Sequence, residues 1–404
     1  MDERQSLKIY KIISTVLIAF FIFGIGVGVG YGLTLRLQPA PATAAPADAP
    51  ADFGLFWEVW HIVQNKFYGD IPSDTQTTYG AIKGALAALN DPYTVFVEPQ
   101  PRALERAELE GQFGGIGAYI LRDEQGNILL NPMVDSPAEK AGVLKNDMLV
   151  QVDETPVTPA MSDDDVVLLI RGEVGTKVKI TVTRTGAPAP ITLEIERAVI
   201  QNPSVDWRIL DDAPAVGYIH IRIFSGKTAK ELARALRELS DAGATRYILD
   251  LRGNGGGLLD AAVDVASAFL EKGIVLKENR RDADPKIYAV KPTAPKLLDA
   301  PLVVLVDGGT ASASEIVAGA LRDNGRAQLI GERTYGKGSV QLVYDLSDAS
   351  SLHVTVARWF TPNDHSIDGV GLSPDVTVLF SEDDRAAGRD PQLLKAIEVV
   401  TGDE

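Results

Sequence analysis

The sequence predicts an α/β protein built from several parts: one N-terminal transmembrane helix, a helical segment, a β-rich domain and a larger α/β domain. Three observations carry this prediction: an uncharged apolar run near the N-terminus, β-strand patterns between residues 111 and 197, and a regular alternation of strand and helix patterns after residue 215. At roughly 150 residues per domain, 404 residues have room for about two to three domains. The hydrophobic fraction of 45% is typical of packed globular domains.

Residues 1–36 are predicted to be a cytoplasmic N-terminus and a membrane anchor. Ile12–Leu33 carries no charge and is long enough to cross the hydrocarbon core, which takes about 20 apolar residues. Arg4, Lys8 and Lys11 precede this run and only Arg36 follows closely, so the N-terminus should stay cytoplasmic and the rest should be exported. We therefore expect a single-pass cell membrane protein whose folded part lies on the exterior or periplasmic side. The alternative is a cleaved signal peptide, although its apolar region is usually only about 7–15 residues long.

Two segments connect the anchor to the first folded domain. Residues 37–51 are rich in Pro and Ala without periodicity, which indicates a semi-extended linker. Residues 52–106 form the N-terminal helical segment, in which Leu55, Val59 and Ile62 keep helical spacing. We expect the aromatic residues of this segment to be core residues, namely Phe56, Trp57 and Trp60. The segment ends in a Pro- and Asp-rich stretch that is predicted to be a loop.

Residues 107–197 are predicted to form the β-rich domain. Residues 114–130 give a strand, a turn and a second strand. Ser136 and Pro137 fit the N-cap and first position of a short helix that Gly142 closes. Asp163–Asp165 places carboxylates at the positive end of a second helix, which carries Val166 on one face.

Residues 198–381 are predicted to form the α/β domain, and 382–404 a C-terminal helix and tail. The alternation of strands and helices predicts a largely parallel sheet covered by helices. Sites in such sheets gather at the C-terminal ends of the strands. Two glycine-containing loops follow strands here, Arg252–Gly257 and Asp307–Glu315.

Composition excludes several classes of function. The net charge of −16 disfavours binding to phosphate backbones, so we expect no nucleic acid partner. The chain has no cysteine, which removes thiol nucleophiles, disulfides and cysteine-based metal sites. Its four histidines show no H-x-x-x-H spacing and no carboxylate cluster beside them, so we expect no metal site and no cofactor, and a metal hydrolase is disfavoured.

Ser312 has two interpretations. Together with Glu315 it fits the capping box S-x-x-E at the start of a helix. From this tetrapeptide alone capping is the favoured interpretation; the other is a nucleophile, because free N–H groups at a helix N-terminus stabilise an oxyanion. One turn can serve both purposes.

Lys337 is a second candidate, although exposed lysines are far more common than catalytic ones. Gly336 and Gly338 leave room on both sides of it. Gln341 follows four residues later, so strand alternation would place it on the same face, where its amide could orient the amine. A serine with a desolvated lysine as base is a known variant of the serine nucleophile.

The β-rich domain resembles a PDZ domain over nearly all of its length. The resemblance rests on GGIGA (Gly114–Ala118) and on SPAEKAGVLKNDMLVQVD (Ser136–Asp153). It implies that a peptide C-terminus is added as a strand, with its carboxylate on a glycine-rich loop. The implied contact residues are Gly114, Gly115, Ile116 and Gly117 for the carboxylate, with Val166 and Ile170 beside the last side chain.

From about Leu55 to Ser381 the chain resembles the carboxyl-terminal processing proteases, the tail-specific serine proteases of family S41. The shared motifs are LDLRGNGGGLLD, TASASE, GERTYGKGSVQ and SIDGVGLSPD, in that order after a PDZ domain. The resemblance implies a crotonase/ClpP-like α/β protease core with the PDZ domain inserted. It also implies the following roles: nucleophile Ser312, general base Lys337, lysine-holding Gln341, and oxyanion N–H donors Gly257 and Ala313. One departure is Gly255, where the family commonly has proline.

The implied function is a membrane-anchored serine endopeptidase that recognises and cleaves the C-terminal tails of exported proteins. The sequence leaves open whether an adaptor protein delivers substrates and whether copies assemble into a homo-oligomer. Two rival interpretations are a trypsin-like protease with a PDZ domain and a catalytically silent, membrane-tethered PDZ scaffold. The first is disfavoured because Gly255 stands where its serine would be. The second is disfavoured by the combination of Ser312, Lys337 and Gln341.

Overall fold

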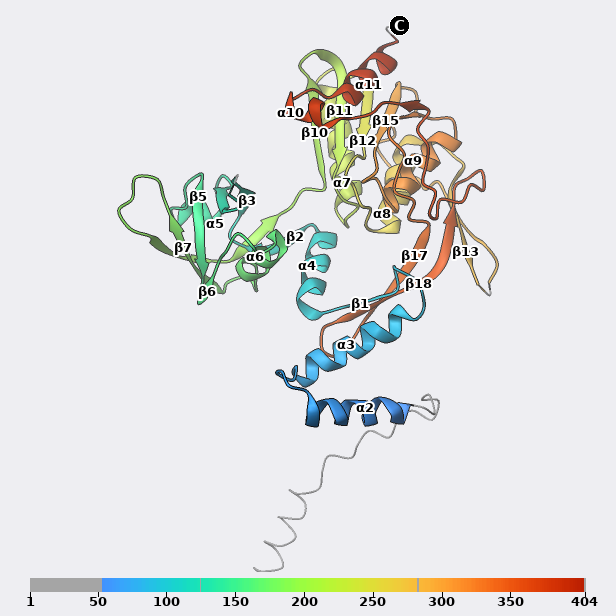
Figure 1. Ribbon diagram of the computed structural model, residues 1–404. Helices are drawn as coiled ribbons and strands as arrows, with labels where there is room; N and C mark the ends of the chain where they lie inside the picture. Colours follow the sequence, from blue (N-terminus) through green and yellow to red (C-terminus); the bar gives the residue numbers. More distant parts are fainter. Residues whose placement is uncertain (1–52, 124, 282, 403–404) are drawn as a thin grey trace, which may run out of the picture. The chain divides into compact units, whose positions relative to one another are not determined.

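The computed structural model describes residues 53–123, 125–281 and 283–402 (Figure 1). The predicted transmembrane helix at 12–33 and the linker at 37–51 lie outside these residues. Among the helices that are described, none has the length and apolar character needed to cross a membrane. The chain divides into two compact units, Met1–Asp74 and Thr75–Glu404.

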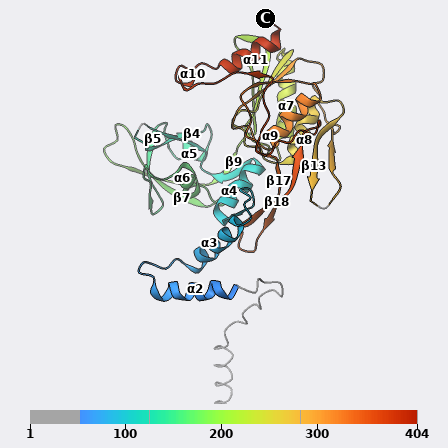
Figure 2. The same ribbon diagram turned by 45° about the vertical axis from the view of Figure 1, so that its right-hand side comes forward.

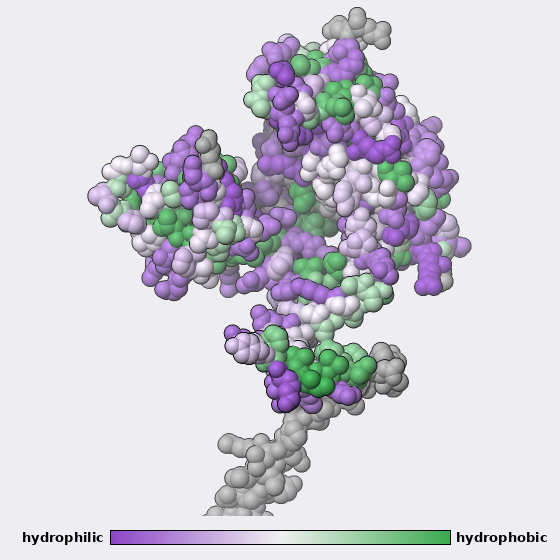
Figure 3. Space-filling model, viewed as in Figure 1, coloured by the Kyte–Doolittle hydropathy of each residue, from purple (hydrophilic) through white to green (hydrophobic). Residues whose placement is uncertain are grey.

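The first unit contains α2 (Phe53–Lys66), so the helix predicted from the spacing of Leu55, Val59 and Ile62 is confirmed. The prediction that its aromatic residues belong to a core is wrong, because α2 has no buried residue and Trp57 is 54% exposed. Figure 3 shows the resulting apolar surface over this helix. The reason is that the described residues of this unit provide no strand and no other complete helix against which α2 could pack.

The second unit begins within the first turn of α3 (Asp74–Ala87), which β1 (Val95–Val97) and α4 (Pro99–Glu110) follow. The predicted loop between residues 90 and 101 is therefore partly wrong. The prolines do not exclude a helix here, because α4 holds them in its first turn, where a missing N–H costs nothing. The helix ends at Gly111 in a left-handed conformation with φ 69°.

The β-rich domain has the predicted strands and both predicted helices. Its main sheet has the order β3-β4-β5-β7-β8 with β6 on β5, and a separate pair is formed by β2 and β9. Ser136 caps the first helix through its side chain, and Ser162 caps the second in a capping box with Asp165. The elements are β2 (Gln112–Gly115), β3 (Ala118–Arg122), β4 (Ile128–Pro132), α5 (Pro137–Lys140), β5 (Asp147–Val152), β6 (Thr155–Pro156), α6 (Asp163–Ile170), β7 (Lys177–Thr183), β8 (Ile191–Glu196) and β9 (Ala198–Gln201).

The α/β domain confirms the predicted alternation and the largely parallel sheet. Strands β11, β12, β15, β16 and β19 run parallel in the order β10-β11-β12-β15-β16-β19, and β10 is antiparallel. Helices α7, α8 and α9 cover one face, and α11 covers the other (Figures 1 and 2). The elements are β10 (Val205–Leu210), β11 (Ala213–Ile221), α7 (Thr228–Asp241), β12 (Arg246–Asp250), α8 (Leu259–Phe269), β15 (Leu302–Val306), α9 (Ala313–Asp323), β16 (Gln328–Gly331), β19 (Val376–Thr377), α10 (Glu382–Ala386) and α11 (Pro391–Thr401).

A second sheet extends from the α/β domain. Its order is β1-β18-β13-β14, and β17 also pairs with β18. The strands are β13 (Ile274–Arg280), β14 (Lys286–Ala289), β17 (Ser339–Asp345) and β18 (Ser351–Phe360). Strand β17 starts two residues after Lys337, and residues of β17 and β18 line the same cavity as the loops that follow β12 and β15.

Candidate active site

The predicted catalytic residues come together in one cavity of about 290 Å³. Ser312, Ala313, Lys337, Gln341 and Gly257 all line it. The rest of the lining is mostly apolar, with two titratable side chains: Glu105, Leu109, Gly255, Leu258, Leu259, Ile316, Ser339, Val340, Val343, His353 and Trp359. A mostly apolar cavity with a few convergent polar groups is the usual form of a binding or catalytic site.

Ser312 lies between β15 and α9 in a strained backbone conformation, with φ 55° and ψ −116°. Such a conformation costs about 1–3 kcal/mol for a residue other than glycine and persists only where the surroundings enforce it. Ser312 and Glu315 have the arrangement of a capping box, but the Ser312 hydroxyl forms no cap hydrogen bond of normal geometry. The Ser312 side chain is half-buried at the cavity wall, whereas Ser314 is buried and donates to the carbonyl of Asn254 at 2.8 Å.

Glu315 connects the serine segment to the lysine segment, a role that the sequence did not indicate. Its buried carboxylate accepts the N–H of Ser312 at 2.9 Å, of Gly336 at 2.8 Å and of Lys337 at 2.9 Å. It also accepts the Thr334 hydroxyl at 2.5 Å. One carboxylate therefore holds the backbone of both candidate catalytic residues.

The Lys337 amine has no carboxylate within ion-pair distance in the described part of the chain. Burial lowers the pKa of Lys337, and the negative charge of Glu105 works against that decrease. Its Nζ lies 5.1 Å from the centre of the Tyr93 ring. A lysine in such surroundings loses its proton more readily than an exposed one.

The glycines beside Lys337 serve another purpose than the predicted one. A Cβ on Gly336 would lie 2.8 Å from the Gly371 nitrogen, and a Cβ on Gly338 would lie 2.6 Å from the Cβ of Asp368. The two glycines thus let the segment pack against residues 367–371, part of the SIDGVG motif. They do not provide open space around the amine.

Gln341 shares the cavity with Lys337, but strand alternation is not the reason. Lys337 precedes β17, and the pairing of β17 with β18 shifts register between Val340 and Gln341. The Gln341 Nε2 donates a hydrogen bond to the backbone carbonyl of Tyr93, not to Lys337. The N-terminal helical segment, to which Tyr93 belongs, therefore takes part in forming the site.

Gly257 and Ala313 present backbone N–H groups at the cavity wall. Gly257 pairs with Phe224 in an isolated parallel β-bridge, whose hydrogen bonds are made by the residues on either side of Gly257. The Phe224 N–H donates to Gly256 O at 2.8 Å, and the Leu258 N–H donates to Phe224 O at 2.7 Å. Ala313 is the first residue of α9 and has no partner four residues earlier. Neither of these two N–H groups donates a hydrogen bond to any residue that the structure describes. Both are free to bind an anionic oxygen.

The loop at Gly255 is held on both sides, so the missing proline does not leave it unsupported. The Asn254 side chain donates to Ile221 O at 2.8 Å and accepts from Gly256 N–H at 2.9 Å. Gly257 must be glycine, because its φ is 133° and a Cβ would lie 2.2 Å from Phe224 O. The sequence did not single out Asn254, although it lies within the quoted motif.

His353 lies on β18 and lines the cavity. Its Nε2 is 3.3 Å from Glu105 Oε2. Burial would raise the pKa of Glu105, but hydrogen bonds and charge from His353 and Arg102 outweigh it and lower that pKa. In the described residues, no group of three His, Cys, Asp or Glu could hold a metal ion.

The PDZ-like domain has a cavity of about 220 Å³ between β3 and α6. Of the predicted peptide-contact residues, Gly115, Ile116, Gly117 and Ile170 line it, and Gly114 does not. Val166 does not line it either: it is fully buried in the domain core, because the helix face that carries it points inward. Val167, the next residue, lines the cavity instead. The adjacent β3 is an edge strand, so one side of it is open to an added strand.

Two family profiles match this chain. The profile of the PDZ domain matches residues 130–184, and that of peptidase family S41 matches residues 215–378. The chain is 37% identical over 351 residues to the carboxyl-terminal-processing protease of Synechocystis sp., which covers 85% of this chain and 81% of that protein. It is 37% identical over 321 residues to the carboxy-terminal processing protease CtpA of Bacillus subtilis, covering 77% of this chain and 67% of that protein.

Among solved structures, the photosystem II D1 C-terminal processing protease is 35% identical with a TM-score of 0.47, covering 81% of this chain and 93% of that chain. The two family matches and the sequence identity to carboxyl-terminal processing proteases point to the same family. The chain belongs to peptidase family S41, as a serine protease of the carboxyl-terminal processing type.

Proposed function

We propose that this chain is a membrane-anchored endopeptidase that binds the C-terminal tails of exported proteins through its PDZ domain and cleaves them with Ser312 and Lys337. The observation that carries the proposal is the cavity in which Ser312, Lys337 and the free N–H groups of Gly257 and Ala313 meet. A catalytically silent scaffold would need none of these features. The strained backbone at Ser312 further favours a catalytic role.

In the proposed reaction the neutral Lys337 amine takes the proton of the Ser312 hydroxyl as its oxygen attacks the scissile carbonyl carbon. The carbonyl oxygen becomes an oxyanion and accepts the N–H groups of Gly257 and Ala313. The Lys337 ammonium then gives its proton to the leaving amine as the C–N bond breaks, which leaves an acyl ester on Ser312. Water, deprotonated by Lys337, hydrolyses the ester and restores the serine.

Gln341 has a supporting role in this proposal. Its Nε2 is engaged by the Tyr93 carbonyl, so its Oε1 is the atom available to accept a hydrogen bond from the lysine. Burial around Lys337 favours the neutral amine that the first step requires.

For tail recognition, a peptide C-terminus would extend the sheet along the open edge of β3. Its carboxylate would bind backbone N–H groups at Gly115–Gly117, and its last side chain would enter the cavity beside Val167 and Ile170. The uncharged run at 12–33 would keep this domain close to the membrane on the exported side. Delivery by an adaptor and assembly into a homo-oligomer are compatible with the proposal and are not required by it.

The test is hydrolysis of a peptide with a free C-terminus by the wild-type protein, Ser312→Ala and Ser314→Ala. We expect Ser312→Ala to lose hydrolysis while staying folded, because the change removes the nucleophile and no regular cap hydrogen bond. Ser314→Ala should keep most of its activity, since its hydroxyl only supports Asn254. Equal losses in the two variants would argue against Ser312, and a wild-type protein that binds tails without cleaving any would favour the scaffold.

A further inference from the structure

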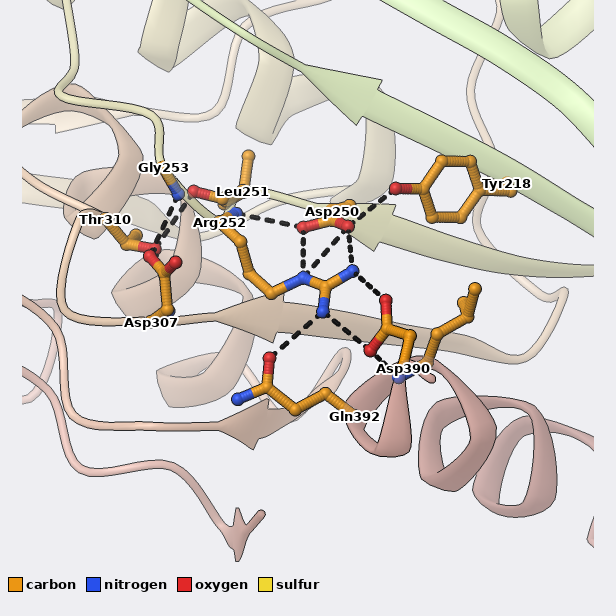
Figure 4. Close-up of polar contacts among 10 residues, drawn as sticks. Tyr218, Asp250, Leu251, Arg252, Gly253, Asp307, Thr310, Asp390 and Gln392 are labelled. Atoms are coloured by element: carbon orange, nitrogen blue, oxygen red, sulfur yellow. Dashed lines mark hydrogen bonds and ion pairs between the residues drawn. The ribbon is translucent and has the colours of Figure 1, made fainter. Parts of the chain in front are cut away.

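A buried polar cluster at the start of the Arg252–Gly257 loop is not used by the proposed reaction (Figure 4). The Arg252 guanidinium binds Asp250 through Nε at 3.0 Å and Nη2 at 2.6 Å. It binds Asp390 through Nη1 and Nη2, both at 2.9 Å, and Gln392 Oε1 through Nη1 at 3.0 Å. Tyr218 completes the cluster by donating to Asp250 at 2.6 Å.

Two of these partners come from a distant part of the chain. Asp390 lies 138 residues after Arg252, caps the N-terminus of α11, and accepts Leu393 N–H at 2.9 Å. Gln392 is fully buried and donates to Val378 O at 2.8 Å. The helix itself is fixed by Ala396 and Val400, which pack on the sheet face opposite α8 and α9. The two acceptors are therefore held by α11 and not by the loop.

Burying the charges of Arg252 and Asp250 costs desolvation, and well-packed apolar residues would give similar stability. The side chain of Arg252 is 13% exposed and that of Asp250 is 3% exposed. Stability alone therefore does not explain the cluster, whereas a need to fix the position of Arg252 would. Two carboxylates in bidentate contact fix the plane of the guanidinium as well as its distance.

The loop that follows Arg252 is tied step by step to the nucleophile segment. Gly253 N–H donates to Asp307 at 2.9 Å, and the Thr310 hydroxyl donates to Leu251 O at 2.9 Å. Asn254 O accepts Ala311 N–H at 3.0 Å. At Gly256 a Cβ would lie 2.9 Å from the Cβ of Ser312. A shift at Arg252 would therefore pass along a tight loop to Gly257, next to the reacting atoms.

We propose that Asp390 and Gln392 are positioning residues for the reaction: through Arg252 they make α11 the outer support of the loop that carries the Gly257 oxyanion donor. The inference rests on the proposed role of Gly257. It assigns a function to the C-terminal helix, for which the sequence alone indicated none.

The test compares Asp390→Asn, Gln392→Met and the control Leu394→Ala in the full-length protein. Asn keeps the helix cap but removes the charge that Arg252 binds. Leu394 is 62% exposed on the same helix, and its hydrogen bond to the cluster runs from its backbone N–H to Asp390 O at 3.0 Å, which alanine keeps. For Asp390→Asn and Gln392→Met we expect kcat to fall about tenfold with KM within twofold, less than the roughly 100-fold loss that follows removal of an oxyanion donor itself. Leu394→Ala should match the wild type.

Two binding measurements on the folded fraction of each variant distinguish a positioning role from a merely structural one. A peptidyl boronate forms a tetrahedral adduct that places an oxygen in the oxyanion site, whereas the cleaved peptide product does not. We expect affinity for the boronate to fall with kcat and affinity for the product to stay unchanged. Normal kcat in both variants, or an equal loss of both affinities, would overturn the inference. Ser312→Ala, measured in parallel, separates the two claims: if it is inactive while Asp390→Asn and Gln392→Met are normal, only the positioning role fails.

Discussion

Replacing Glu315 by glutamine should weaken the fold and the reaction together, although the two side chains have nearly the same shape. Oε1 accepts the Thr334 hydroxyl and Gly336 N–H, and Oε2 accepts the N–H groups of Ser312 and Lys337. An amide has only one oxygen, so in either orientation its NH₂ group faces one of these pairs of donors. Two buried donors at about 1–3 kcal/mol each predict a decrease in unfolding free energy of about 2–6 kcal/mol.

The assay pairs urea unfolding with kcat measured on the folded protein. We expect Glu315→Gln to lose more than about tenfold in kcat, because displacing a reacting group by 1 Å can cost about 100-fold. The control is Glu278→Gln, since Glu278 is also buried but lies on β13 and binds Arg280 and Tyr288, away from the cavity. That variant should lose stability and keep kcat. A Glu315→Gln protein with normal stability and normal kcat would refute the reasoning.

Two further predictions concern protonation and tail binding. Only the neutral form of Lys337 can accept the serine proton, so kcat/KM should rise with pH through one ionisation below the ordinary lysine pKa of about 10.4, and a chelator should leave the activity unchanged. Glu105→Gln should move this rise to lower pH, because Glu105 opposes the lowering of the Lys337 pKa; an unchanged pH profile would argue against that influence. Val167→Ser should raise KM for peptides with a free C-terminus and leave KM for amidated peptides unaffected, because Val167 lines the cavity between β3 and α6. Equal cleavage of free-acid and amidated peptides by the wild type would show that the PDZ domain does not select tails.

The sequence predicted the α/β alternation and the site loops because both depend on local patterns. The loops 252–257 and 307–315 directly follow buried strands, and neighbouring parallel strands bring their ends to the same edge of a sheet. Ser312 and Lys337 were identified through motifs whose residues are contiguous in the chain. Such local patterns can be recognised without knowledge of tertiary contacts.

The parts that the sequence missed depend on contacts between distant segments. Glu315 was recognised only as a cap, because its bonds to Gly336 and Lys337 require two loops to approach each other. The partnership of Arg252 with Asp390 spans 138 residues and leaves no periodic signal. Val166 was chosen over Val167 because helical spacing shows that a face is apolar but not whether it points to the core or to the groove.

The most direct measurement for the central claim is the site of covalent labelling by a serine-reactive phosphonate probe, mapped by mass spectrometry on the full-length protein. The account predicts a single modified residue, Ser312, with labelling lost in Ser312→Ala, strongly reduced in Lys337→Arg because guanidinium stays protonated, and retained in Ser314→Ala. Labelling that persists in Ser312→Ala, or a modified residue outside the cavity of Ser312 and Lys337, would contradict it.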